Sequence, residues 1–310
     1  MAENRLKLYK VTNDTVEECR YQTYAYEREL QTLVETHMEL FFGVRFIKSE
    51  YAITDGRMDS IGLDENFSPV IFEYKRSLNE NVINQGLFYL DWLLDHKGNF
   101  KVLVQETLGH DVADQIDWSQ PSVVCIASDF TKFDLHAVKQ INRNIKLVKY
   151  SRFDNDLLSF EHLNAPTLQA TDREDVDSVS IGETNATTSK RKTDPYHTIK
   201  VEKAPDDIKA LYKAVCEFAE ELGDDVVKSQ QKYYLAFKRL KNFMCVEVYR
   251  KNVVLRLKLD PKAEPIEEGF SRDMSTIGHY GTGDYEITLT QLSDFERAQP
   301  YIRKAYDLLR

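Results

Sequence analysis

The chain has 310 residues, of which 42 % are hydrophobic and 30 % are charged, and its formal net charge at pH 7 is −10. This length suffices for two ordinary domains of a globular protein. Because no apolar stretch approaches the ~20 residues of a membrane span, and residues 1–10 lack the apolar core of a secretory signal, we expect a cytoplasmic protein without a membrane partner. The four cysteines are widely spaced, which argues against a disulfide framework or a zinc site.

The N-terminal part of the sequence alternates helix and strand patterns. A helix is expected over residues 23–42, ended by Gly43 in the position where glycine commonly terminates helices. Further elements are expected in chain order: strands at 44–53, 57–63 and 70–75, a helix at 81–94, strands at 100–104 and 122–127, a helix at 132–142 and a strand at 145–150. This succession predicts an α/β domain with a mixed sheet.

The composition changes between about residues 164 and 199, where few large apolar side chains occur. Such a stretch cannot bury enough surface to offset the entropy of ordering it, so it reads as a flexible linker. The predicted organisation is therefore an N-terminal domain over 1–163, a linker over 164–199 and a smaller α+β domain over 200–310.

Two neighbouring strand candidates carry charged side chains. Residues 56–59 read Gly-Arg-Met-Asp, and residues 70–76 read Val-Ile-Phe-Glu-Tyr-Lys-Arg. Since strand side chains alternate with a period of two, Glu73 and Lys75 point to one face and the apolar residues between them point to the other, toward a core. An acidic residue followed on the next strand by Glu-x-Lys is typical of a metal-dependent phosphodiesterase. A solvated salt bridge on an edge strand is the alternative that this short motif leaves open.

A further carboxylate comes from the first predicted helix. At 100° per residue, Leu30, Leu33 and Val34 fall on one apolar stripe, and Glu27 lies about 60° from Leu30, at the edge of that stripe. Glu35 falls on the solvent side of the same helical wheel. A glutamate on the inward side fits a metal or phosphate-water site, and the alternative is a first-turn glutamate that interacts with the helix dipole.

These residues resemble the PD-(D/E)XK nuclease superfamily, and within it the branch that contains NucS-type mismatch and flap endonucleases. The resemblance covers about residues 24–105 and implies a restriction-endonuclease-like core with a mixed sheet flanked by helices. At the position of the superfamily's proline this chain has Met58, a position that varies widely. Four motifs in order carry the resemblance: Glu27-x-x-Leu30-x-x-Leu33, Gly56-Arg57-x-Asp59, the run from Val70 to Arg76, and Gln85-x-x-x-Tyr89.

The resemblance implies a role for each motif residue. Asp59, Glu73 and Glu27 would hold Mg²⁺ or Mn²⁺, which suits a ligand set made only of oxygen atoms. Lys75 would orient and activate the attacking water. The remaining roles concern the phosphates: Gln85 near the scissile phosphate with Tyr89 packed beside it, and Arg57 and Arg76 facing phosphates.

The C-terminal residues 208–309 resemble a domain of unknown function whose members often carry the label "predicted transport protein". No mechanism comes with this resemblance, and the chain offers no segment that could cross a membrane. The resemblance rests on five segments: Leu211-Tyr212, Tyr234 to Arg239, Asn242-Phe243, Leu257 to Pro261, and Arg272 to Gly281.

Positive charge concentrates between residues 228 and 258, where nine basic residues accompany the single acidic residue Glu247. Aromatic residues are interleaved, so a basic sheet face could bind phosphates while aromatic rings stack on bases. A solvated face whose lysines prevent edge aggregation is the alternative. The nucleic-acid-binding candidates in this stretch are Lys232, Lys238, Arg239, Lys241, Arg256 and Lys258.

Taken together, the sequence favours a metal-dependent endonuclease that hydrolyses phosphodiester bonds of DNA rather than RNA, in DNA repair or in defence against foreign DNA. Two alternatives stay open: a nucleic-acid-binding protein that keeps the nuclease fold without turnover, and a ligand-gated sensor. Residues 1–163 contain 18 basic and 26 acidic residues, a net charge of −8. Affinity for nucleic acid must therefore come from the metal, from the C-terminal domain or from the second subunit of a homodimer.

Overall fold

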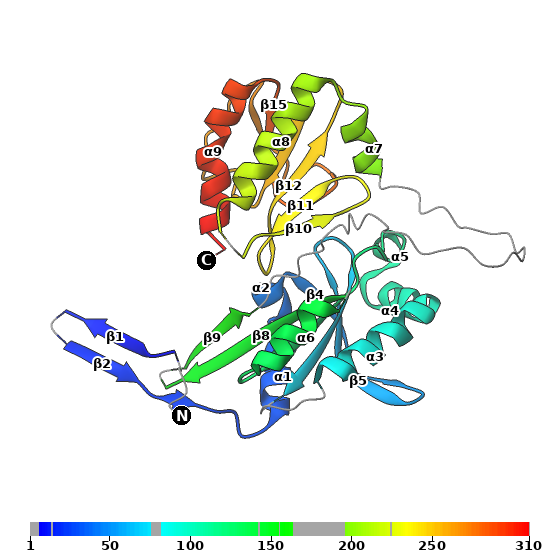
Figure 1. Cartoon of the computed structure of the whole chain (residues 1–310), viewed down its shortest axis with the longest axis vertical. Coiled ribbons are helices and arrows are strands. Elements are labelled where there is room, and N and C mark those ends of the chain that lie inside the picture. The colour runs from blue at the N-terminus through cyan, green and yellow to red at the C-terminus, as the bar shows by residue number, and fades with distance from the viewer. Residues whose placement is uncertain are drawn as a thin grey trace, which may run out of the picture.

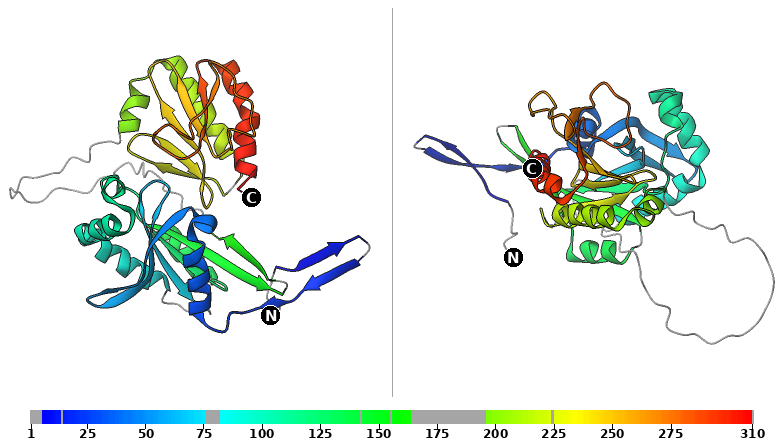
Figure 2. Two further views of the ribbon diagram at one scale, coloured as in Figure 1. Left: turned by 180° about the vertical axis from the view of Figure 1, so that it is seen from behind. Right: turned by 90° about the horizontal axis from the view of Figure 1, so that it is seen from above.

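The computed structural model describes residues 6–13, 15–75, 82–141, 143–154, 156–163, 196–223 and 225–309. Figure 1 shows two units, one built from each end of the chain, and a two-stranded arm. The arm consists of β1 (Leu8–Thr12) and β2 (Thr15–Cys19), which pair antiparallel. It extends away from the N-terminal unit in every view (Figures 1 and 2). None of the helices in the described ranges is long and apolar enough to cross a lipid bilayer.

The N-terminal unit is built on a seven-stranded mixed sheet in the order β3-β8-β7-β6-β5-β4, with β9 paired to β8. The strands β4, β5 and β6 form an antiparallel meander, and β6, β7 and β8 run parallel. The mixed sheet that the sequence predicted is confirmed. The bounds of the strands are β3 (Tyr21–Gln22), β4 (Val44–Ile53), β5 (Gly56–Asp64), β6 (Pro69–Lys75), β7 (Ser122–Ala127), β8 (Asn144–Phe153) and β9 (Leu157–His162).

Helices cover both faces of this sheet. On one face, α1 (Glu27–Thr36) and α2 (Met38–Phe42) pack onto the apolar side chains of β6 that include Phe72 and Tyr74. On the other, α3 (Val82–Asp95), α4 (Lys97–Leu108) and α6 (Lys132–Gln140) pack onto Ile71 and Val123; the short α5 (His110–Ala113) follows α4. Each large apolar side chain buried in these layers contributes about 1.5–3 kcal/mol to stability. The central strand β6 is thereby held between two cores.

Two expected elements of the N-terminal unit differ in the structure. The single helix over 23–42 is wrong: α1 ends at Thr36, and His37, with φ −122° and ψ 23°, breaks the helix before α2. The break rotates α2, so that Met38 is buried and Leu40 is exposed. The strand at 100–104 is also wrong, because Phe100 and Val104 are four residues apart and share the buried face of α4.

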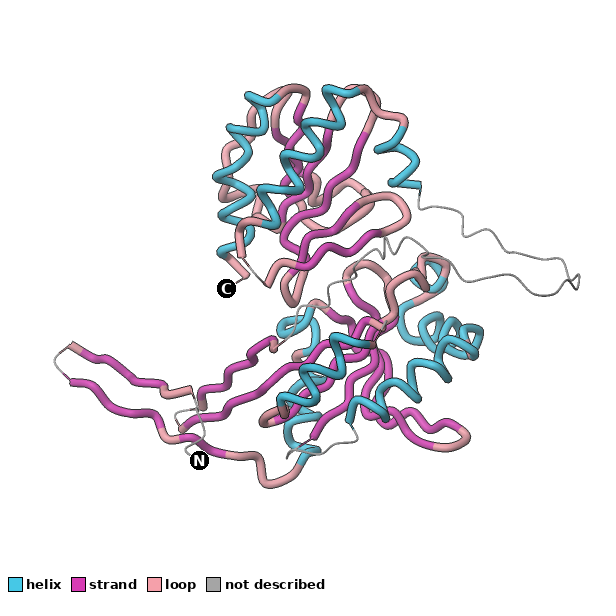
Figure 3. Tube along the Cα trace, in the orientation of Figure 1, coloured by secondary structure: helices cyan, strands magenta, loops and turns pink. Residues whose placement is uncertain are grey.

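The C-terminal unit is a six-stranded sheet in the order β10-β11-β12-β13-β15-β14, in which every pair is antiparallel. Figure 3 shows α8 and α9 side by side on one face of this sheet. Helix α7 begins at Tyr196, so residues 196–199 of the expected linker are helical. The bounds are α7 (Tyr196–Glu202), α8 (Asp206–Glu220), β10 (Val227–Gln230), β11 (Leu235–Lys238), β12 (Asn242–Val248), β13 (Val253–Leu257), β14 (Ser271–Asp273), β15 (Tyr285–Leu289) and α9 (Leu292–Asp307).

The turn between β5 and β6 joins the two units. Its Asn66 Oδ1 accepts hydrogen bonds from Tyr234 Oη (2.9 Å) and from Asn242 Nδ2 (2.7 Å). The carboxylate of Glu65 accepts the backbone N–H of Asn242 (2.9 Å) and forms an ion pair with Lys258 (2.5 Å). Because Asn66 and Asn242 are almost fully buried, these hydrogen bonds form in a site from which water is excluded.

Candidate active site

The candidate site lies where β5 and β6 separate. Their backbone pairing runs from Leu63–Pro69 to Ser60–Phe72 and stops there. Beyond that point the side chains replace the ladder: the Asp59 N–H donates to Glu73 Oε1 (3.3 Å), and the Tyr74 N–H donates to Asp59 Oδ2 (3.0 Å). Two carboxylates are therefore held on adjacent strands by the backbone of the opposite strand.

Burial and mutual repulsion make the two carboxylates costly to ionise. Burial raises the pKa of Asp59 above its usual range, against the opposing effects of the Tyr74 N–H and Lys75. Burial and, after it, the nearby charge of Asp59 raise the pKa of Glu73 to about 9. Two like charges this close cannot both be ionised cheaply unless a cation stands between or beside them.

Lys75 and Glu27 complete the cluster that the sequence predicted. Lys75 Nζ lies 3.6 Å from Glu27 Oε1, which joins the end of β6 to the first residue of α1. The Lys75 side chain is largely buried, with 18 % of it exposed, whereas that of Glu27 is 39 % exposed. The positive charge of Lys75 lowers the pKa of both Asp59 and Glu73 and so partly offsets the effect of burial.

A polar network behind the site was missed by the sequence reasoning. The buried Gln31 Nε2 donates to the Asp59 carbonyl (2.9 Å) and to Glu35 Oε1 (3.0 Å), which also accepts from Ser60 Oγ (2.7 Å). Glu35 was expected to face solvent, and the structure turns it toward the sheet instead. A helical wheel could not show the inward orientation of Glu35, because it finds the buried side of a helix from the apolar residues alone. Gln31 and Glu35 instead contact polar groups of the strands.

The remaining motif residues make different contacts in the structure. Gln85 is on the first turns of α3, and its Oε1 is buried without a hydrogen-bond donor among the described residues. Tyr89, one turn later, places its hydroxyl 3.4 Å from the Arg57 N–H. The Arg57 guanidinium itself pairs with Glu50 (2.6 Å). Arg76 lies outside the described residues.

The donor set suits a hard divalent cation. Within the part of the chain that the structure describes, no three His, Cys, Asp or Glu side chains form a group that could hold a metal ion. Asp59 and Glu73 nevertheless offer oxygen atoms in a buried site where their charges repel, and a divalent cation would offset that repulsion. The third predicted ligand, Glu27, is engaged with Lys75 in this state. The fit of this site to a divalent cation therefore rests on Asp59 and Glu73.

Most of the predicted nucleic-acid-binding cations of the C-terminal unit have carboxylate partners. Lys238 lies 3.7 Å from Asp64 and is buried, and Lys258 pairs with Glu65. A nucleic-acid interface on this unit stays a prediction, with much of its positive charge compensated inside the protein. The remaining predicted cations are placed as follows: Arg239 with Asp225, Arg256 between Glu247 and Glu286, Lys241 partly buried beside Glu65, and Lys232 exposed.

Comparisons with known proteins fit this arrangement. Residues 26–117 match the family model of the endonuclease NucS C-terminal domain, and residues 200–309 match a domain of unknown function, DUF5655. An uncharacterized protein of Haemophilus influenzae is 28 % identical over 313 residues, covering 97 % of this chain and 99 % of that protein.

Solved structures show a more distant likeness. A repair endonuclease from Pyrococcus abyssi is 18 % identical, with 41 % of this chain and 49 % of that chain covered and a TM-score of 0.27. An EndoMS-dsDNA2 complex is also 18 % identical, with 43 % and 51 % covered and a TM-score of 0.28. This chain thus spans about half the length of those proteins, and scores this low support no conclusion about function.

The family matches confirm both resemblances seen in the sequence, although the C-terminal match is to a domain of unknown function and carries no transport label. The mixed sheet between two helical layers agrees with the N-terminal match. The chain therefore carries a NucS-type, PD-(D/E)XK-like endonuclease domain near its N-terminus, followed by a DUF5655 domain.

Proposed function

We propose that this protein is a Mg²⁺- or Mn²⁺-dependent endonuclease that hydrolyses phosphodiester bonds of DNA, with a role in DNA repair or in defence against foreign DNA. The observation that carries the proposal is the separation of β5 and β6 at Asp59 and Glu73, with Lys75 beside them. Glu73 is buried and Asp59 is partly buried, and charges in such a place destabilise the fold unless a partner such as a cation compensates them. The match to an endonuclease family supports a nucleic-acid substrate.

The residues of this chain would share the work of hydrolysis. Asp59 and Glu73 would hold the divalent ion, which supplies charge to offset the developing negative charge of the phosphate. Lys75 Nζ lies near Glu27 Oε1. Its ammonium group can donate a hydrogen bond to the attacking water and so orient that water toward the phosphate. Gln31 fixes the Asp59 backbone through the Asp59 carbonyl, which keeps the carboxylates in register.

Cleavage of end-labelled single-stranded DNA, double-stranded DNA and RNA tests this proposal. The wild type should cut DNA with Mg²⁺ or Mn²⁺ and stop on addition of EDTA. Asp59→Asn and Lys75→Met should each lower the cleavage rate by at least about 100-fold. Asp95→Asn, an exposed carboxylate at the end of α3, is the matched control and should cut like the wild type.

The outcomes separate this proposal from its competitors. A wild type that binds DNA without ever cutting it would replace the nuclease with a binding protein. Cutting that survives both Asp59→Asn and Lys75→Met would place the active site elsewhere. A preference for RNA would overturn the choice of DNA while leaving the reaction and its residues in place.

A further inference from the structure

Three tyrosines of the C-terminal unit form one contiguous aromatic patch, here called the tyrosine platform. They are Tyr196 of α7, Tyr233 of the turn between β10 and β11, and Tyr280 of the loop between β14 and β15. The rings of Tyr233 and Tyr280 are stacked, with centroids 4.3 Å apart and planes at 27°, and the Tyr196 ring meets Tyr233 edge-on at 5.8 Å. Tyr196 is 49 % exposed and Tyr280 is 54 % exposed. Single exposed apolar side chains are common, whereas a contiguous patch marks an interaction site.

Tyr280 presents one ring face to solvent. Its other face lies on Tyr233, the only aromatic ring that it contacts within the described residues. Because more than half of Tyr280 is nevertheless exposed, the outer face of this stacked pair is open. Aromatic rings attract one another in an offset stack, so a further planar ring can extend the pair by one layer.

Backbone hydrogen bonds and close packing hold the two stacked tyrosines in place before any ligand binds. The His197 N–H donates to the Lys232 carbonyl (2.9 Å), which ties the turn between β10 and β11 to α7. In the loop between β14 and β15, Gly281 has a φ of +79° and lies so close to β12 that a side chain there would meet Cys245. The Thr282 N–H donates to Cys245 Sγ (3.4 Å). A preorganised surface loses little conformational entropy when a ligand binds, which favours affinity.

Two lysines lie beside the tyrosine platform. Lys232 Nζ lies 4.9 Å from the centroid of the Tyr233 ring, and Lys200 Nζ lies 5.1 Å from that of the Tyr196 ring. Lys232 is exposed and Lys200 is partly exposed, and neither forms an ion pair with a carboxylate among the described residues. Their positive charge is therefore available to an anionic ligand.

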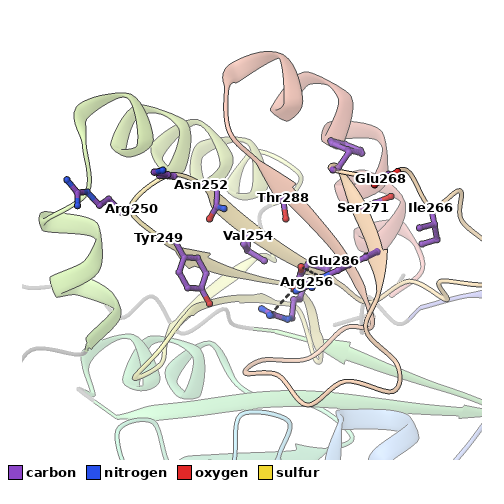
Figure 4. Close-up of a pocket in the computed structure, with 14 residues that line it drawn as sticks. Tyr249, Arg250, Asn252, Val254, Arg256, Ile266, Glu268, Ser271, Glu286 and Thr288 are labelled. Atoms are coloured by element: carbon purple, nitrogen blue, oxygen red, sulfur yellow. Dashed lines mark hydrogen bonds and ion pairs between the residues drawn. The ribbon is translucent and has the colours of Figure 1, made fainter.

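The hollow on the neighbouring sheet face differs from the tyrosine platform. Figure 4 shows Arg256 on the floor of this hollow paired with Glu286, with 2.9 Å between Nη2 and Oε2. Arg256 also bonds to Glu247, and Lys200 Nζ covers the Tyr249 ring at 4.2 Å from its centroid. The charges on the floor of the hollow neutralise one another, whereas the platform combines an open ring face with uncompensated cations.

An open aromatic face flanked by cations suits a chain of planar bases joined by phosphates. Inside a duplex each base is stacked between its neighbours and shows only its edges in the grooves, so an unpaired strand is needed to offer a base face. We infer that the tyrosine platform binds an unpaired strand of DNA, with a base stacked on Tyr280 and phosphates at Lys232 and Lys200. The choice of DNA rests on the proposed function, whereas binding itself requires no cleavage.

Fluorescence anisotropy with the full-length protein in EDTA, where metal-dependent cleavage cannot occur, tests this inference. The probes are a labelled thymidine 12-mer and a labelled duplex of 12 base pairs, and the 12-mer should bind more tightly than the duplex. Tyr280→Leu should weaken binding of the 12-mer at least about fivefold, the loss expected for one base stacked on an aromatic ring. Tyr280→Phe keeps the ring and should bind like the wild type.

Lys232→Ala tests the phosphate contact separately. It should flatten the dependence of log Kd on log salt concentration by about 0.7, the contribution of one phosphate contact to single-strand binding. Two control variants should change neither the affinity nor its salt dependence: Tyr9→Ala, an exposed tyrosine of the N-terminal arm, and Lys139→Ala, an exposed lysine of α6. Because Tyr280 is exposed, Tyr280→Leu should leave the melting temperature within about 2 °C of the wild type, which separates binding from folding.

The outcomes separate this inference from the proposed function. Failure of the 12-mer to bind overturns the inference, as does binding that Tyr280→Leu leaves unchanged, or a duplex that binds as tightly as the 12-mer. If the wild type still cuts DNA with Mn²⁺, none of these results contradicts the nuclease. Conversely, a wild type that binds the 12-mer through Tyr280 but never cuts DNA supports the platform and removes the nuclease.

Discussion

Removing the charge of Glu73 should stabilise the metal-free protein while abolishing its activity. Burial and the charge of Asp59 raise the pKa of Glu73 from 4.5 to about 9, so at pH 7 the folded protein holds a proton that the unfolded chain releases. Over the roughly 2.5 pH units between 4.5 and 7, at ~1.4 kcal/mol per unit, this lowers the free energy of unfolding by about 3.5 kcal/mol. Glu73→Gln removes the titrating group and keeps its shape, so we expect a gain of about 1–3 kcal/mol at pH 7.

The sign of the pH dependence follows from the direction of the shift. Because the folded-state pKa of Glu73 is raised, its stabilising contribution is fully present below about pH 4.5 and is lost as the pH rises toward 9. The difference in unfolding free energy between wild type and Glu73→Gln should therefore widen by about 1.4 kcal/mol per pH unit between pH 5 and 8. Mg²⁺ favours the ionised carboxylates, so millimolar Mg²⁺ should narrow this difference.

Urea titrations followed by tryptophan fluorescence measure the free energy of unfolding of the N-terminal domain, which contains Glu73. The chain has two tryptophans, Trp92 on α3 and Trp118 before β7, and both belong to the N-terminal domain. Glu106→Gln, an exposed glutamate on α4, is the control and should follow the wild type at every pH. Equal pH slopes for wild type and Glu73→Gln, or a variant less stable than wild type at pH 8, would refute the reasoning.

Two further substitutions test other parts of the fold. Burial and, secondarily, a neighbouring lysine lower the pKa of Lys146 to about 7; this penalty is fully present below pH 7 and is relieved as the pH rises toward 10.5. In urea titrations, Lys146→Met should therefore raise the unfolding free energy at pH 7 by about 1–4 kcal/mol, with a smaller gain at pH 10. Lys149→Met on the same strand, which breaks the ion pair with Asp129 (3.1 Å), should bring no such gain. Thr131→Ala, which removes the capping box that Thr131 forms with Asp134 at the start of α6, should cost about 1 kcal/mol by thermal denaturation.

The central part of the site could be predicted because its signals are local. Alternation along one strand separates Glu73 and Lys75 from the apolar Phe72 and Tyr74, and the structure places the apolar pair in the core beneath α1. The position of the Asp59 carboxylate beside β6 could be predicted because β5 and β6 are consecutive in the chain and are joined by a short turn. Where pairing partners are adjacent in the chain, the pattern of one strand constrains the other.

The features that were missed depend on contacts between distant residues. Arg256 looked like a cation on a surface strand, and only the register of β13 with β15 shows that Glu286 stands opposite and buries it. The docking of Asn66 onto Asn242 joins residues from separate domains, which no local period reveals. The break at His37 likewise comes from packing of α2 on the sheet, since the apolar pattern runs through it.

The cleavage rate of double-stranded DNA in Mn²⁺, compared between wild type, Asp59→Asn and the control Asp95→Asn, tests the central claim most directly. The account predicts metal-dependent cutting by wild type and control, and a loss of at least about 100-fold in Asp59→Asn. A substituted protein that remains folded and cuts at the wild-type rate would contradict the assignment of the β5–β6 carboxylates as the active site.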